Sequence, residues 1–235
     1  MNQINRKSKI SSFFELLSSH CEYIMTFALG LLMIVQRFLR GVYKPVMDDW
    51  FLYGDLYKGI SNRLANFSIP NEKFAIRPLA GVFDCFVNAP LFNHLWIVEL
   101  FLTFSLLFGS FLIIKALRRN NFASGGFFLC LVCLFPVGLE ATYWIAAATR
   151  VAYSLLFIGC ATLSLDYCYK SDKVKFLVRF AVFGMLSVCF YEPAIVVYII
   201  LTLFIVWNNY KNKKDLLPLA IMAAHIAIIG IYYIL

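Results

Sequence analysis

Long apolar runs alternate with short polar connections along this chain. A helix needs about 20 mostly apolar residues to cross the hydrocarbon core of a membrane, and a window of that length finds seven candidate segments. They cover residues 22–39, 91–114, 122–139, 151–167, 176–190, 193–209 and 216–235. The fifth and sixth are short and meet at Tyr191-Glu192-Pro193, which predicts a helical hairpin with a tight turn. The pattern therefore predicts an all-α fold, a polytopic transmembrane helical bundle of about seven spans.

The segment 40–90 is too long for a simple connection between two spans. Apolar and charged residues are interspersed after Trp50, which is typical of an amphipathic helix, and the stretch from Pro78 to Pro90 is apolar but too short to span. We expect both to be interfacial helices in the first outer loop, with their apolar faces toward lipid. Asp84 lies within the second of them.

Composition places the chain outside the soluble class. Of its residues, 62% are hydrophobic and only 14% are charged, whereas about a quarter of the residues in soluble domains are charged. We therefore expect a single transmembrane domain over 1–235, with 1–21 as its N-terminal tail. The sequence ends inside an apolar run, so it fits either a complete seven-span unit or the N-terminal part of a longer protein.

The basic residues set the predicted orientation, because short cytoplasmic loops are enriched in Lys and Arg. Most of the 21 basic residues fall at the N-terminus and after the second, fourth and sixth spans. If seven helices alternate, all four clusters lie on one side, which predicts a cytoplasmic N-terminus. The net charge of +8 is then mainly an insertion signal, and nucleic acid is not an expected partner.

Carboxylates are unusually placed on the other, outer side. Asp48 and Asp49 are adjacent near the start of the 40–90 loop, and the two short outer connections carry Glu140, Arg150 and Glu192. Ionisable groups close to hydrocarbon are costly and tend to mark functional cavities. The hypothesis is one outward-facing cleft lined by these residues. The simpler alternative for one of the two aspartates is a helix N-cap.

This set suits transfer chemistry at the membrane surface. A carboxylate can deprotonate an acceptor hydroxyl, and arginine offers a two-point fork to a departing phosphate. Arg77 and Arg150 are the outer arginines nearest the predicted boundary, and Lys44 is another cation close to Asp48. Snorkelling to headgroups is the simpler alternative for both arginines.

The remaining polar residues are expected to have structural roles. Glu99 lies within the second span and is expected to face the bundle interior. Asp166, Asp172 and Asp215 are expected to be solvated charges, and no role is assigned to the three histidines. The seven cysteines lie in or beside spans and are expected to act as small apolar side chains.

Four short motifs share the predicted outer face. They are Asp48-Asp49-Trp50, Ile76-Arg77-Pro78-Leu79, the run from Glu140 through Trp144 to Arg150, and Tyr191-Glu192-Pro193. In this order they resemble the GT-C superfamily of integral-membrane glycosyltransferases. More closely, they look like bacterial glucosyl transferase proteins that modify O-antigen or surface polysaccharide, and the resemblance covers about residues 20–210.

The resemblance implies sugar transfer from a polyprenyl-phosphate donor to a glycan or lipid-linked acceptor outside the cytoplasm, in a bacterial inner membrane. It implies that Asp48 or Asp49 is the catalytic base and that Arg77, Arg150 or Lys44 contacts the donor phosphate. The residues on the sugar or acceptor side would be Trp50, Glu140, Trp144, Tyr191 and Glu192. A divalent cation (Mg or Mn) stays open, because some members of the superfamily use one and others do not. A donor-synthesising enzyme and a flippase would be partners.

Three other readings remain. A polysaccharide polymerase would use the same face and similar donors, whereas a flippase should carry charges deep in its helices. A channel or transporter should show an internal repeat or broken helices near the midplane, and the sequence shows neither. A non-catalytic membrane subunit of a glycan-assembly system would tolerate neutral replacement of the acid pair.

Overall fold

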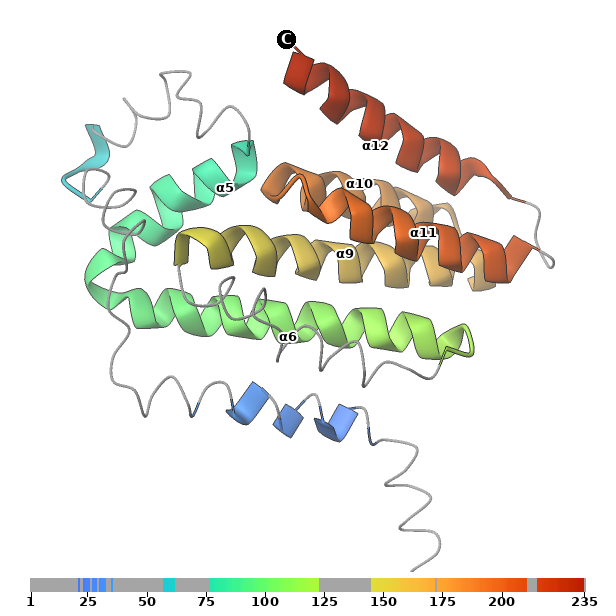
Figure 1. Cartoon of the computed structure of the whole chain (residues 1–235), viewed down its shortest axis with the longest axis horizontal. Coiled ribbons are helices and arrows are strands. Elements are labelled where there is room, and N and C mark those ends of the chain that lie inside the picture. The colour runs from blue at the N-terminus through green and yellow to red at the C-terminus, as the bar shows by residue number, and fades with distance from the viewer. Residues whose placement is uncertain are drawn as a thin grey trace, which may run out of the picture.

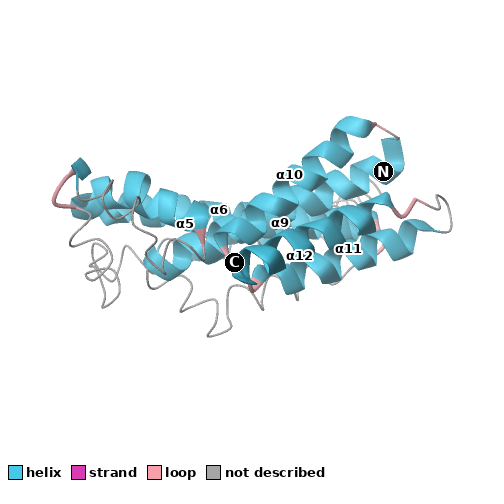
Figure 2. Cartoon of the chain, turned by 90° about the horizontal axis from the view of Figure 1, so that it is seen from above, coloured by secondary structure: helices cyan, strands magenta, loops and turns pink. Residues whose placement is uncertain are grey.

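The computed structural model describes residues 77–122, 145–171, 173–210 and 215–234, together with 57–61 and part of 21–35. In these ranges every regular element is helical, which confirms the all-α class (Figures 1 and 2). The chain order is α5 (Pro78–Phe83), a π-helical turn (Asp84–Asn88), 3₁₀ turns (Ala89–His94), α6 (Leu95–Arg119), α9 (Ile145–Ser171), α10 (Val174–Phe190), α11 (Ala194–Tyr210) and α12 (Leu217–Ile234).

Helices α6 and α9 run side by side in the same direction (Figure 1). Their first turns share an apolar cluster that contains Leu95 and Ile145, and near their last turns Arg119 pairs with Asp166. In the middle the backbones approach closely, because a Cβ atom on Gly159 would lie only 2.5 Å from the carbonyl oxygen of Gly109. Small residues permit such close contact between apolar helices. A parallel second and fourth span is what an alternating topology requires.

Helices α10 and α11 pack against α9, and α12 packs against α10 and α11 (Figure 1). The Ser154 hydroxyl of α9 donates to the carbonyl oxygen of Ser187 in α10 at 2.9 Å. A turn at Tyr191–Pro193 leads from α10 into α11, where the sequence predicted it. Tyr198 of α11 then packs against Gly184 of α10, where a Cβ atom would lie 2.6 Å from the tyrosine oxygen. The main core joins α6, α9, α10 and α11 through residues with at most 1% exposure, including Ile113, Ile158, Leu165, Phe180, Tyr198 and Ile205.

The segment from Pro78 to His94 folds back from the start of α6 (Figure 1). His94 has non-helical backbone angles, with φ −131° and ψ 38°, and so separates this segment from α6. The sequence predicted an interfacial helix here with its polar side toward water. That orientation was wrong for Asp84, which is fully buried within the fold. The helix is also short, since regular α-helix ends at Phe83 and a π-helical turn follows.

Large apolar side chains are exposed on the outside of the bundle, while polar groups are buried within it. Phe101 and Phe104 of α6 are 62% and 65% exposed, and Trp207 of α11 is 82% exposed. By contrast, Asp166 is fully buried and Glu99 is only 5% exposed, as expected for a residue facing the interior. Water would penalise this inverted pattern, whereas lipid accommodates it.

Two helical segments in the described chain are long and apolar enough to cross a membrane, judged by length and composition. They are Pro78–Arg119, in which α6 supplies the long straight part, and Ile145–Ser171. The shorter apolar helices are Ala194–Tyr210, Leu217–Tyr232 and Tyr23–Leu32. The number of seven spans stays a prediction, since 123–139 and much of 22–39 lie outside the described residues.

Candidate functional site

Arg77 and Glu192 form a two-point ion pair at one end of the bundle. Arg77 Nε donates to Oε2 of Glu192 at 2.6 Å, and Nη2 donates to Oε1 at 2.5 Å. The guanidinium carbon also lies 5.1 Å from the centroid of the Tyr191 ring. The two parallel hydrogen bonds to the Glu192 carboxylate, together with the Tyr191 ring, fix the plane of the guanidinium as well as its position.

Two prolines place this pair at helix entries. A residue before proline is disfavoured in the helical conformation, and proline itself is well suited to the first turn of a helix. Arg77 precedes Pro78, the first residue of α5, and has φ −136° and ψ 73°. Glu192 precedes Pro193 in the turn between α10 and α11. Both side chains therefore start from non-helical backbone just outside a helix, where they reach across to each other.

A second, more deeply buried network lies beside this pair. Nη2 of Arg150 donates to Oδ2 of Asp84 at 3.1 Å, and Nδ2 of Asn88 donates to Oδ1 of the same carboxylate at 3.1 Å. Asn88 also donates to the Thr149 hydroxyl at 2.8 Å, and that hydroxyl donates back to the carbonyl oxygen of Ile145. Asp84 and Asn88 begin and end the π-helical turn. Short π-helical turns are frequent at functional sites.

The two networks influence each other electrostatically. Burial raises the pKa of Glu192, but the hydrogen bonds from Arg77 and from its own backbone, and the charges of Arg77 and Arg150, lower it by more. The net result is a pKa below the usual glutamate value. Glu192 is therefore a carboxylate at neutral pH. Since the charge of Arg150 contributes, both arginines belong to one charged region.

The two arginines differ in accessibility. The side chains of Arg77 and Glu192 are 29% and 27% exposed, whereas those of Arg150 and Asp84 are 13% and 0% exposed. Arg150 also donates to the carbonyl oxygen of Ala146 in its own helix. A ligand phosphate can reach Arg77 by displacing one half-buried carboxylate. At Arg150 it would have to break the ion pair with the fully buried Asp84, which is costly.

The structure thus brings together four residues that the sequence assigned to the donor and acceptor sites: Arg77, Arg150, Tyr191 and Glu192. The others lie outside the described residues. They are the proposed bases Asp48 and Asp49, the cation Lys44, and Trp50, Glu140 and Trp144.

Candidate metal ligands do not form a cluster in the part of the chain that the structure describes. No group of three or more His, Cys, Asp or Glu side chains within it could hold a metal ion. The two carboxylates of the site, on Asp84 and Glu192, each pair with an arginine.

Sequence reasoning missed several polar residues of the interior. Asp84, Asn88 and Thr149 belong to the buried network, and the only sequence signal was a carboxylate in an apolar stretch. Asp166 was wrongly predicted to be solvated. It is fully buried and accepts from Asn120 Nδ2 at 2.8 Å, with Lys170 Nζ 2.7 Å away and Arg119 as a further partner.

The other residues without assigned function have structural roles. Asp215 accepts from the backbone N–H of Leu217 at 3.0 Å and so caps α12, while Asp172 lies outside the described residues. Cys85 and Cys168 are buried, as predicted for thiols that pack as apolar groups. His225 is buried and its Nδ1 lies 3.0 Å from the Tyr198 hydroxyl, which joins α12 to α11.

No protein-family model, curated protein or solved structure matches the chain.

Proposed function

We propose that this chain is an integral-membrane glycosyltransferase of the GT-C type. It would transfer a sugar from a polyprenyl-phosphate donor to a glycan or lipid-linked acceptor on the outer side of a bacterial inner membrane, with its N-terminus in the cytoplasm. Asp48 or Asp49 would be the base that takes the proton of the acceptor hydroxyl. Arg77 would hold the donor phosphate as the bond to the sugar breaks.

The observation that carries the proposal is the accessible, oriented guanidinium of Arg77. Its fork is planar, held against Tyr191 and matched to two oxygen atoms of one anion. A phosphate group, like the Glu192 carboxylate, offers two oxygen atoms that one guanidinium can bind at the same time. Donor binding would therefore exchange one anion for another, and the released Glu192 carboxylate would face the hydroxyl-rich sugar or acceptor.

Arg150 contributes to the electrostatics of this site without being its accessible arginine. It neutralises the fully buried Asp84 and contributes positive charge toward Glu192. Positive charge that is fixed before the reaction stabilises a departing phosphate without a reorganisation cost. We therefore assign Arg150 a positioning and electrostatic role, and Arg77 the direct contact.

One observation favours the flippase-like alternative. Asp84 and Asp166 are fully buried near opposite ends of the bundle, and Glu99 is buried between them along the chain. Charges that extend into the interior are a feature of substrate paths. In that case the chain would move a lipid-linked sugar across the membrane, and the two carboxylates at Asp48 and Asp49 would be dispensable.

The test is sugar transfer by membranes that contain this chain, supplied with radiolabelled polyprenyl-phosphate sugars. The wild type is compared with Asp48→Asn and Asp49→Asn, and Asp215→Asn serves as a control that removes a carboxylate from a helix cap. Removal of a general base lowers a rate by about 10²–10⁴-fold.

Transfer that is lost in one of the two variants, but kept in the control at equal protein level, supports the enzyme and identifies its base. Transfer that survives both substitutions contradicts the catalytic role of the acid pair. Movement of labelled donor across the membrane without transfer to glycan favours the flippase-like alternative.

A further inference from the structure

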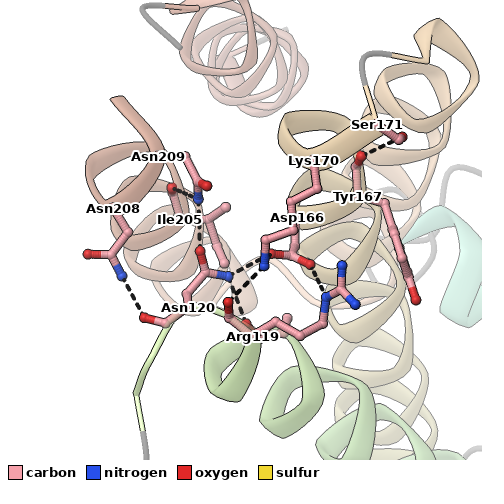
Figure 3. Close-up of polar contacts among 10 residues, drawn as sticks. Arg119, Asn120, Asp166, Tyr167, Lys170, Ser171, Ile205, Asn208 and Asn209 are labelled. Atoms are coloured by element: carbon pink, nitrogen blue, oxygen red, sulfur yellow. Dashed lines mark hydrogen bonds and ion pairs between the residues drawn. The ribbon is translucent and has the colours of Figure 1, made fainter. Parts of the chain in front are cut away.

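An open pocket of about 470 Å³ lies at the end of α9 opposite to the Arg77–Glu192 site. It is formed where α6, α9 and α11 end beside one another (Figure 3). Its lining residues are Arg119, Asn120, Asn121, Phe122, Lys170, Phe204, Asn208 and Asn209. This volume is in the range of small-molecule sites, about 300–1,000 Å³.

The two cations of the pocket, Arg119 and Lys170, are both paired with the carboxylate of Asp166. Asp166 is fully buried and does not line the pocket. It pairs with Arg119 through Oδ2 and with Lys170 through Oδ1, the latter at 2.7 Å (Figure 3). The Lys170 ammonium also donates to the carbonyl oxygen of Arg119 at 2.7 Å. Both cations are thereby positioned at the pocket wall while remaining about one-third exposed.

Asparagines connect the wall across helices. Asn209 of α11 donates to the side-chain oxygen of Asn120 at 2.8 Å, and Asn208 donates to the backbone oxygen of Asn120 at 3.2 Å. Asn120 in turn donates to Asp166. Asn120 and Asn209 are only 8% and 9% exposed. The polar wall is therefore a connected network that is fixed before any ligand binds, which reduces the entropic cost of binding.

The chemistry of the lining selects an anion with several oxygen atoms. Among the described residues that line the pocket there are two cations, four amide side chains and no carboxylate. The remaining wall is apolar, with Phe122 and Phe204 in an edge-to-face contact at 5.2 Å between ring centroids. Basic pockets between transmembrane helices bind phosphate-bearing headgroups, and aromatic side chains beside them suit the adjoining apolar part of such a molecule.

We infer that this pocket binds a phosphate group, carried either by a membrane lipid or by a small soluble phosphoester, with Lys170 and Arg119 as its charged contacts and Asn208 as a hydrogen-bond donor. This site is separate from the proposed donor site, since Lys170 is in the last turn of α9 and Arg150 is near its start. It does not depend on the proposed glycosyltransferase activity.

The experiment measures ligand retention by the purified full chain in phosphatidylcholine nanodiscs. Two probes are used separately, short-chain phosphatidic acid for the lipid source and glucose 1-phosphate for the soluble source. The variants are Lys170→Met and Asn208→Ala. The matched control is Lys175→Met, which removes the same charge from an exposed position at the start of α10.

We expect the wild type and Lys175→Met to bind at least one probe equally well, and Lys170→Met to bind it at least about tenfold more weakly, the effect of losing one charged hydrogen bond. Asn208→Ala should weaken binding less, and it leaves the contacts of Asp166 intact, so it reports on the pocket even if Lys170→Met unfolds. Binding of phosphatidic acid alone assigns a lipid source, and binding of glucose 1-phosphate assigns a soluble one. Binding of neither probe overturns the inference, as does equal binding by Asn208→Ala, Lys175→Met and the wild type.

Discussion

Arg77 and Glu192 lie 115 positions apart in the chain and meet as a two-point ion pair, with contacts of 2.6 and 2.5 Å. The pair joins the entry of α5 to the turn between α10 and α11. It therefore connects the folded-back segment to the main bundle, and it also presents the most accessible arginine of the candidate site. A ligand-binding role requires Arg77 to exchange Glu192 for another anion, whereas a purely structural role requires the pair to stay intact.

Replacing Arg77 by lysine keeps the positive charge but removes the planar fork. Because lysine binds phosphate as a point charge, we expect the KM for the polyprenyl-phosphate donor to rise by about 10–100-fold, the range for a lost charged hydrogen bond. The measurement is the donor dependence of sugar transfer. Arg179→Lys is the matched control, since Arg179 is exposed on α10 and contacts the Phe176 ring. An unchanged KM in Arg77→Lys would contradict direct phosphate contact.

The Arg77–Glu192 ion pair also predicts that the stability of the fold depends on pH. The pKa of Glu192 is lowered in the folded protein, so its ionised form stabilises the fold. This contribution is fully present above the unfolded glutamate pKa of about 4.3 and is lost as the pH falls through the lower folded value. We expect the difference in melting temperature between wild type and Glu192→Gln to be largest at neutral pH and to vanish in strong acid. A difference in melting temperature that grows on acidification would contradict a lowered pKa of Glu192 in the folded protein.

The contact between Gly109 and Gly159 predicts a sharp steric effect. In Gly159→Ala the new Cβ atom would lie 2.5 Å from a backbone oxygen of α6, which cannot move as a flexible side chain could. We expect a loss of about 1–3 kcal/mol in unfolding free energy, the usual cost of overpacking. Gly230→Ala in α12 is the control, because nothing lies within 4 Å of its added Cβ, and it should be neutral or stabilising by up to about 1 kcal/mol. Equal effects at the two glycines would contradict the close crossing.

Asp84 and Arg150 should behave as a coupled pair. Removing one partner leaves a buried charge, so Asp84→Ala should cost about 3–5 kcal/mol, whereas Asp84→Ala combined with Arg150→Met should cost clearly less than the sum of the single changes. Unfolding in nanodiscs measures all three variants. Asp215→Ala is a useful comparison, since the loss of a helix cap costs about 1 kcal/mol. Strict additivity of the two changes would show that the ion pair contributes little.

Helices α6, α9, α10, α11 and α12 lie where the sequence predicted apolar spans, at 91–114, 151–167, 176–190, 193–209 and 216–235. The apolar runs alone were sufficient for these five. The turn at Tyr191–Pro193 was also predictable, since Pro193 interrupts an otherwise continuous apolar stretch. The helix ends were predicted less well. The second span was predicted to end at residue 114, whereas α6 continues to Arg119, and the fifth was predicted to start at residue 176, whereas α10 starts at Val174.

The buried polar contacts were not predictable from the same pattern. Asp166 is near the end of α9 and was expected to be solvated, but its partner Arg119 is 47 positions earlier in the chain. Likewise Arg150 is 66 positions from Asp84. Hydrophobic periodicity reports which residues share a helix face and carries no information about which distant side chain neutralises a charge. The fold-back of Pro78–His94 onto the bundle, which buries Asp84, also depends on such long-range packing.

The most direct test of the account is the affinity of the purified chain in nanodiscs for a radiolabelled polyprenyl-phosphate sugar. It compares the wild type with Arg77→Gln and Glu192→Gln. If Arg77 binds the donor phosphate in competition with Glu192, the two variants change affinity in opposite directions: Arg77→Gln weakens donor binding, and Glu192→Gln strengthens it. If the pair only holds the fold together, both variants weaken binding alike or leave it unchanged, and that result would contradict a donor-phosphate site at Arg77.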